Sequence, residues 1–344
     1  MHGADFKEGK MAREKFAVDM DSAYTNIYKL GSGLVLSEPT VAGVETGEKP
    51  TVKVIGAEAY KLIGKTSKNT KMVFPVFEGE IVNNDVCAAV LSGFLSKVKS
   101  GGITSPSILF AVPCGVSPKT VENYRYVAAK CGIKKVCFAE SPILSALGQR
   151  IPLTESSPCF CIDMAGGVTN IAAVSLDGVI AGISVNFGGN KISADIIDYL
   201  SEYYGVQVGL QTAERLKRET ASLDENDALT ALVNGRSVET GSPCSVSVKA
   251  KDLVKPVRKY YDKIAELSTE LLKKLPPEVS AEITHAGIYV SGAESGVYGL
   301  EKYYGKLFGM KITVADKGRM SVALGGGIAL GNEDLLKKII IKTD

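Results

Sequence analysis

The feature that most constrains this chain is a short internal repeat whose two copies lie 144 residues apart. The copies read Phe16-x-Val18-Asp19-Met20-x4-Thr25-Asn26-Ile27 and Phe160-x-Ile162-Asp163-Met164-x4-Thr169-Asn170-Ile171. Six residues are identical at fixed spacing, and in both copies two apolar runs flank a short turn, which is typical of a β-hairpin. The alternative is two unrelated hairpins that both favour Asp before a turn. We interpret the repeat as a duplication and expect two similar halves.

Two such hairpins, placed face to face, would form a binding site for a polyphosphate. Tight turns offer backbone N–H groups that bind phosphate oxygens. Asp19 and Asp163 end the first strand of each hairpin, where a divalent metal ion or its water ligands would bind. The repeat therefore predicts a cleft for a metal-bound polyphosphate, although it indicates architecture more firmly than chemistry.

The composition is that of an ordinary globular protein. The 344 residues carry a formal net charge of +2, and 45% of them are hydrophobic, which excludes a disordered or fibrous chain. The length suggests two domains or one large fold with insertions. Because the charges balance, electrostatics give no reason to expect a nucleic-acid partner. The first 15 residues lack the apolar segment of a signal peptide and are expected to be an extension.

The longest uncharged run, 100–118, has about the length of a membrane span but contains three prolines and three glycines. We therefore expect a loop and a strand there. The seven cysteines are scattered and odd in number, which disfavours a disulfide framework and favours the reducing cytoplasm. With two histidines and no C-x-x-C motif, a zinc site is not expected.

Strand and helix patterns alternate along the chain, which predicts an α/β fold with mixed sheets. Asn84 is a candidate cap for an amphipathic helix, and 107–112 is a continuous apolar strand. Ser117 and the proline after it are expected to open another helix. A long helix is predicted over 252–275. The glycines at 325–327 are expected to permit close helix packing rather than to bind a ligand.

Two further segments have more than one interpretation. Gly188-Gly189-Asn190 precedes a helix, so it is either an anion site at a helix N-terminus or a flexible corner. The charged helical stretch at 212–218, with Glu214 and Arg218 spaced i,i+4, is either a functional surface or a solvated helix face, and the solvated face is favoured.

From Phe16 to about Ile340 the sequence resembles MreB, the bacterial actin of the actin and sugar-kinase superfamily. The resemblance rests on scaffold motifs: Ile63-Gly64-Lys65-Thr66, Pro75, Gly79-x-Ile81, Thr212-Ala213-Glu214-Arg215-x-Lys217 and Leu275-Pro276-Pro277-Glu278. It implies an α/β, actin-like two-lobed fold with duplicated ribonuclease-H-like core subdomains and two small insertion subdomains. The implied boundaries are an N-terminal extension at 1–15, lobe I at 16–157 with its insertion at 46–84, lobe II at 158–320 with its insertion at 189–250, and a C-terminal return to lobe I at 321–344.

The resemblance also implies ATP with Mg²⁺ as ligands, with Asp19 and Asp163 next to the metal. The implied nucleotide contacts are Asp19, Ser22, Ala23 and Tyr24 in the first hairpin, Asp163, Gly166, Gly167 and Val168 in the second, Gly189, Glu214, Arg215 and Lys217 on the adenosine side, and Ser291, Gly292, Ala293 and Glu294 in the adenine turn.

The sequence departs from MreB inside this implied site. Asp21 replaces a glycine of the first phosphate turn, and Ala165 replaces the first of three glycines in the second. Ala293 and Glu294 replace glycines of the adenine turn. A carboxylate about 4 Å from a phosphate oxygen costs roughly 4 kcal/mol at an effective dielectric constant of 20. These changes predict weakened nucleotide binding.

The implied catalytic position has changed as well. MreB has Glu-Glu-Pro, whose second glutamate polarises the attacking water, whereas this chain has Glu140-Ser141-Pro142. A serine is a far poorer base at neutral pH, and Glu140 is one residue out of register. We expect at most weak ATPase activity.

Three functions follow as hypotheses. The first is a filament-forming, cytoplasmic cell-shape scaffold with slow or lost hydrolysis, which pairs with itself and with morphogenesis proteins. The alternative is a non-polymerising pseudo-ATPase interaction module. A sugar kinase is disfavoured, because no catalytic base for a substrate hydroxyl is evident. The segment 101–106 could contact a membrane peripherally, but its single isoleucine buries too little area for stable anchoring.

Overall fold

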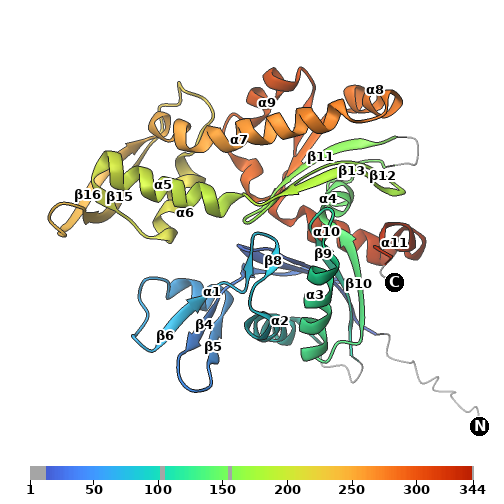
Figure 1. The fold of residues 1–344 in the computed structure, drawn as a ribbon, viewed down its shortest axis with the longest axis horizontal. Helices are drawn as coiled ribbons and strands as arrows, with labels where there is room; N and C mark the ends of the chain where they lie inside the picture. Colours follow the sequence, from blue (N-terminus) through green and yellow to red (C-terminus); the bar gives the residue numbers. More distant parts are fainter. Residues whose placement is uncertain (1–12, 101–104, 154–156, 343–344) are drawn as a thin grey trace, which may run out of the picture.

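The computed structural model describes residues 13–100, 105–153 and 157–342. The described chain forms two lobes (Figure 1), with β1–β10 in the blue-to-green lobe and β11–β18 in the other. The loop at 101–104, on which the membrane expectation depends, and most of the N-terminal extension lie outside the described residues.

The first lobe is built on a five-stranded mixed sheet with the order β10-β9-β1-β2-β3. Its strands are β1 (Lys15–Met20), β2 (Tyr24–Lys29), β3 (Gly33–Pro39), β9 (Ser107–Val112) and β10 (Lys135–Glu140). Strands β1, β9 and β10 are parallel, and β1-β2-β3 is an antiparallel meander. Helices α2 (Asn84–Val98) and α3 (Pro118–Lys130) contribute Leu91, Phe94 and Tyr124 to the core on one face.

The second lobe repeats this arrangement with the order β13-β12-β11-β17-β18. Its strands are β11 (Cys159–Met164), β12 (Thr169–Ser175), β13 (Gly178–Val185), β17 (Ile288–Ser291) and β18 (Ile312–Val314). The covering helices are α7 (Ala250–Lys273), α8 (Pro277–Ala286) and α9 (Leu300–Phe308). Tyr261 and Tyr304 are buried in the core beneath them.

Each lobe carries a smaller sheet. In the first lobe β4 (Ala42–Glu45) pairs with β5 (Thr51–Ile55) and β6 (Thr70–Val73), beside α1 (Gly56–Lys61) and the hairpin of β7 (Val76–Phe77) and β8 (Glu80–Ile81). In the second lobe β14 (Val206–Gln207), β15 (Thr230–Ser237) and β16 (Pro243–Lys249) lie beside α5 (Gly189–Tyr204) and α6 (Leu210–Thr220).

Helices α4 (Ser141–Gly148) and α10 (Ser321–Gly331) lie between the two large sheets (Figure 1). A shared core joins Ala17 and Leu109 of the first sheet to Ala172 of the second through Leu144 and Val322 of these helices. Helix α11 (Glu333–Ile339) follows, and Ile340 bridges to Ala139 of β10. The chain thus returns to the first sheet after completing the second.

The local predictions are confirmed with two corrections. Asn83, not Asn84, caps α2: its backbone is extended, and its side chain accepts a hydrogen bond from the backbone N–H of Val86. The long helix predicted over 252–275 begins and ends two residues earlier, at Ala250–Lys273. Among the described residues, no helix is both long and apolar enough to span a membrane.

Candidate functional site

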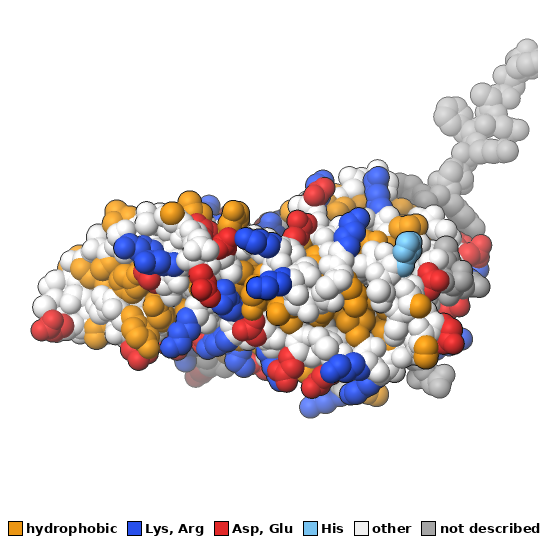
Figure 2. All heavy atoms as spheres, turned by 90° about the horizontal axis from the view of Figure 1, so that it is seen from above, with side chains coloured by type: hydrophobic (Ala, Val, Ile, Leu, Met, Phe, Trp, Pro, Cys, Tyr) orange, Lys and Arg blue, Asp and Glu red, His pale blue; other side chains and the backbone are white. Residues whose placement is uncertain are grey.

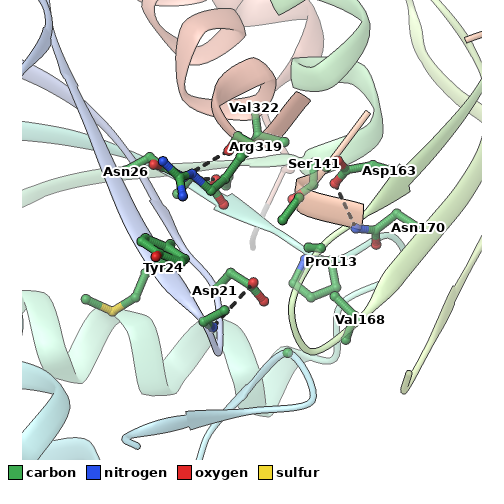
Figure 3. Close-up of a pocket in the computed structure, with 18 of the residues that line it drawn as sticks. Asp21, Tyr24, Asn26, Pro113, Ser141, Asp163, Val168, Asn170, Arg319 and Val322 are labelled. Carbon is green, nitrogen blue, oxygen red and sulfur yellow. Dashed lines mark hydrogen bonds between the residues drawn. The ribbon is translucent and has the colours of Figure 1, made fainter. Parts of the chain in front are cut away.

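The repeated Asp and Asn residues are cross-strand partners within each hairpin. Asp19 lies opposite Asn26, and the Asn26 amide donates to the Asp19 carboxylate over 3.2 Å. In the second hairpin Asp163 lies opposite Asn170, with a corresponding distance of 3.4 Å. Both Asp19 and Asp163 line one cavity, and Figure 3 shows Asp163 beside Asn170 there. The duplication therefore specifies a paired carboxylate and carboxamide at the tip of each hairpin.

Asp21 in the first turn reaches across to the second turn. Its Oδ2 accepts a hydrogen bond of 2.7 Å from the backbone N–H of Gly166, and its Oδ1 accepts one of 3.2 Å from that of Gly167. The N–H of Ala23 in its own turn adds a third bond, to Oδ2, at 3.5 Å. We call this set of hydrogen bonds the Asp21 bridge. It fills the backbone nest that the sequence assigned to a phosphate.

The cavity between the two turns is small, about 40 Å³ in volume, and acidic. The pKa of Asp19 is raised well above its ordinary value, mainly by burial and also by the neighbouring charges of Asp21 and Asp163. Burial also raises the pKa of Asp21, against its backbone hydrogen bonds. Burial raises the pKa of Asp163 to about 6, while hydrogen bonds from Ser291 and Asn170 oppose the shift.

These shifts predict a stability that falls as the pH rises. A carboxyl group whose pKa is higher in the folded protein binds its proton more tightly there, so its stabilising contribution is lost as the pH passes the folded pKa. For Asp163 the window runs from 3.8 to about 6. Without nucleotide or metal, we expect this group to lower the free energy of unfolding by about 1 kcal/mol between about pH 5 and pH 7.

Urea unfolding of the wild-type protein and of Asp163→Asn at both pH values measures this effect. The variant should lose about that part of the pH dependence. An identical pH dependence in the two proteins would contradict the assignment.

Ser141 lines the cavity, as expected from the implied catalytic position, but its hydroxyl donates to the backbone carbonyl of Val112 over 3.1 Å. Glu140 does not take its place. Its Oε1 accepts a hydrogen bond of 2.6 Å from the N–H of Gly115, and the residue is outside the cavity lining. No glutamate is thus placed to polarise a water molecule among the described residues that line this cavity.

A larger cavity of about 410 Å³ adjoins the first on the side of α6. Glu294 and Lys217 face each other there, with an Nζ–Oε1 distance of 2.8 Å, and both side chains are largely buried. The Lys217 ammonium also donates to the carbonyl of Gly189 over 2.8 Å. Glu294, in the implied adenine turn, therefore neutralises the lysine implied to hold adenosine.

The predicted charge pattern of α6 is partly wrong. Glu214 does not form the expected surface ion pair. Instead it accepts a hydrogen bond from the hydroxyl of Tyr60 on the other lobe, whose carbonyl accepts one from Gln211. Burial, followed by the contact with Glu214, raises the pKa of Tyr60. The i,i+4 ion pair of this helix is Arg215 with Glu219, at 3.0 Å. The small insertions of the two lobes therefore touch across the cleft.

The helix N-terminus at Gly188-Gly189-Asn190 is not open to an anion. The N–H of Gly189 donates to the carbonyl of Ala165 over 3.1 Å, and that of Asn190 to the carbonyl of Gly166 over 2.8 Å. The segment is a corner rather than an anion site, but these hydrogen bonds hold it in place, so it is not the flexible corner that was predicted. These bonds fix the second turn against α5.

Most of the sequence-predicted residues are brought together. Those that line one of the two cavities are Asp19, Ala23, Tyr24, Asp163, Gly166, Val168, Glu214, Lys217, Gly292, Ala293 and Glu294. Those outside both linings are Ser22, Gly167, Gly189, Arg215 and Ser291. Ser291 acts behind the cavity, because its hydroxyl donates to Asp163 over 2.9 Å.

Arg319 was not among the residues predicted from the sequence. It lines both cavities, and its Cζ lies 4.3 Å from the centroid of the Tyr24 ring (Figure 3). Its backbone carbonyl accepts a hydrogen bond from the side chain of Asn26. Asn26 belongs to the internal repeat, and this was the sequence feature that could have indicated a contact here. Arg319 itself lies in a short 3₁₀ turn, Gly318–Met320, without a motif.

Known protein structures share this fold. MreB5 of Spiroplasma citri bound to AMPPNP superposes with a TM-score of 0.87 at 26% identity, over 95% of this chain and 98% of that one. The MamK double helical filament gives a TM-score of 0.78 at 16% identity, over 93% and 99%, and shows the fold alone. Two hairpin-bearing lobes around one cleft thus define an actin-like protein.

Similarity in sequence identifies the family. The model of the MreB/Mbl protein family matches residues 13–338, so the chain belongs to that family. The cell shape-determining protein MreB of Escherichia coli K12 is 29% identical over 331 residues, 94% of this chain and 95% of the relative. The cell shape-determining protein Mbl of Bacillus subtilis is 27% identical, over 95% and 99%. The resemblance seen in the scaffold motifs is confirmed.

The phosphate region as it stands does not fit a triphosphate. Its nest is filled by the Asp21 bridge, and its cavity of about 40 Å³ holds little more than a water molecule or two. Among the described residues, no group of three or more His, Cys, Asp or Glu side chains is arranged to hold a metal ion. Of these two cavities, the one of about 410 Å³ beside α6, which we call the adenosine-side cavity, has room for a larger ligand.

Proposed function

We propose that this protein is a filament-forming cell-shape scaffold in which nucleotide hydrolysis is slow or lost. The carrying observation is that the family fold is retained across 13–338, while the residue at the water-polarising position is a serine bonded to a backbone carbonyl. A scaffold needs the shape of the protomer, whereas turnover needs the catalytic base. We also propose the division into two lobes, each with a small insertion, at the boundaries given above.

We propose that the adenosine-side cavity can hold the base and ribose of a nucleotide, whereas the phosphate region must open before it can bind the phosphates. MreB5 of Spiroplasma citri is described with AMPPNP and with ADP, and the adenosine-side cavity of this chain offers Tyr24, Lys217 and Glu294 to a base and ribose. If a nucleotide with Mg²⁺ enters, Asp19 and Asp163 are the carboxylates next to its phosphates. The Asp21 bridge must open first.

Exposed hydrophobic side chains favour self-association over a monomeric interaction module. Leu232 of β15 is 63% exposed, and Leu229 and Val238, which flank this strand, are 53% and 56% exposed. Figure 2 shows hydrophobic side chains gathered among charged ones toward that end of the elongated molecule. Burying such residues between protomers contributes about 25 cal/mol per Å². We propose end-to-end contacts of copies of this chain along its long axis.

Pelleting and negative-stain microscopy at micromolar protein test this proposal, with and without ATP and magnesium. We expect the wild-type protein to form filaments in both conditions and Leu232→Glu to stay in the supernatant. Phosphate release in the same samples should not exceed that of Ser141→Ala. A protein that is monomeric in every condition would favour the interaction module. Turnover that is lost in Asp163→Ala would show that hydrolysis is retained.

A further inference from the structure

The Asp21 carboxylate joins two turns that belong to different lobes. Asp21 follows β1 in the first lobe, and Gly166 and Gly167 follow β11 in the second. The two oxygens bond separately to two successive backbone N–H groups, at 2.7 and 3.2 Å. Asp21 is half-buried between the turns that it connects. Figure 3 shows Asp21 at the tip of its hairpin, pointing into the space between the two turns.

The chemistry of this contact is that of anion binding. Successive backbone N–H groups in a turn form a concave nest that favours a negatively charged oxygen. Hydrogen bonds to a charged acceptor are roughly twice as strong as neutral ones. The glycines are required by the close approach, because a Cβ on Gly166 would lie 2.7 Å from Asp21 Oδ2 and a Cβ on Gly167 would lie 2.2 Å from Ser22 Oγ.

The backbone of Asp21 is not held in a conformation that demands glycine. Among the described residues, Glu78 and Arg150 are the non-glycine residues with positive φ. Aspartate at 21 therefore places a carboxylate in the nest without the strain of a positive φ.

Other contacts cross the cleft in the same closed arrangement. The side chain of Asn170 in the second lobe accepts a hydrogen bond of 3.0 Å from the N–H of Cys114 in the first. At the mouth of the cleft, Tyr60 of α1 bonds to Glu214 of α6. Hydrogen bonds at three separate places therefore join the two lobes.

We propose that Asp21 is a built-in anion that occupies the phosphate nest of the second hairpin and holds the two lobes closed without a nucleotide. A triphosphate and Asp21 compete for the same N–H groups, so ligand entry requires the bridge to open. One consequence rests on the proposed function: if the protein forms filaments, the bridge allows them to assemble without nucleotide.

Hydrogen exchange resolved to single amides tests the bridge, in full-length protein without nucleotide and with a chelator present. We expect the amides of Gly166 and Gly167 to be protected in the wild-type protein and to exchange about 10-fold faster or more in Asp21→Ala. Asp21→Asn keeps the shape but loses the charge and should give an intermediate rate. Asp177→Asn, an exposed turn aspartate outside the cleft, is the matched control and should match the wild type.

Inorganic phosphate provides a second readout. Millimolar phosphate should restore protection of the two amides in Asp21→Ala and should leave the wild-type rates unchanged. Wild-type rates in Asp21→Ala, or equal protection of both proteins by phosphate, would overturn the proposal. Thermal unfolding of each variant identifies a fold defect: a general loss of protection in Asp21→Ala without a larger local loss at the two glycines would also count against the bridge.

The failure of the bridge and the failure of the scaffold function are distinguishable. If the bridge is correct, wild-type filaments form without nucleotide, whereas Asp21→Ala pellets only when ATP and magnesium are added. Wild-type filaments that form only with ATP would overturn the bridge and leave the scaffold function standing. A wild-type protein that never pellets would overturn the scaffold function, while the exchange rates still decide the bridge.

Discussion

The variant Asp21→Gly is expected to bind ATP roughly 5- to 150-fold more tightly than the wild-type protein in excess magnesium, which corresponds to about 1–3 kcal/mol. The substitution removes a carboxylate from the position of a phosphate oxygen, where repulsion at about 4 Å costs roughly 4 kcal/mol at an effective dielectric constant of 20 before screening is discounted. It also frees the N–H groups of Gly166 and Gly167. Isothermal titration of both proteins measures the difference.

Asp21→Ala separates charge from backbone flexibility in this experiment. Glycine adds conformational freedom that costs about 0.5–1 kcal/mol on folding, whereas alanine removes the carboxylate without that cost. Both variants should gain affinity, and Asp177→Asn should not. If neither variant gains affinity, Asp21 is not the obstacle, and the ion pair of Lys217 with Glu294 in the adenosine-side cavity becomes the next candidate.

The second large effect concerns the contact between α4 and α10. A Cβ on Gly325 would lie 1.7 Å from the carbonyl oxygen of Leu144, and a Cβ on Gly148 would lie 1.8 Å from that of Ser321. The two helices must therefore move apart to accept any side chain there. Because this helix pair joins the cores of both lobes, we expect Gly325→Ala to lower the free energy of unfolding by about 3 kcal/mol, near the upper end of overpacking costs.

Gly331→Ala in the same helix is the matched control. Its Cβ would meet only Leu30 Cδ1, at 3.8 Å, which is ordinary van der Waals contact. Alanine there should leave the stability unchanged or raise it by up to about 1 kcal/mol through helix propensity. Urea unfolding of the three proteins decides the matter, and equal midpoints for Gly325→Ala and Gly331→Ala would refute the close-packing explanation.

The sequence alone determined the features that depend on residues close together in the chain. The repeated Asp and Asn residues predicted two equivalent hairpins because a strand, a tight turn and a strand are specified within about a dozen residues. The glycines at 325–327 predicted close helix packing, since glycine brings backbones together wherever it occurs. The strand at 107–112 and the helix opened by Ser117 followed from apolar periodicity and capping in the same way.

Tertiary structure alone decided the partners of the charged groups in the cleft. Asp21 bonds to amides 145 residues further along the chain, Glu214 pairs with Tyr60 rather than with a residue of its own helix, and Lys217 pairs with Glu294. A carboxylate takes the nearest donors once the chain has folded, and no local pattern records which distant segment will supply them. The repeat predicted a nest for a phosphate; only the packing of the two lobes showed that a side chain of the protein itself lies in it.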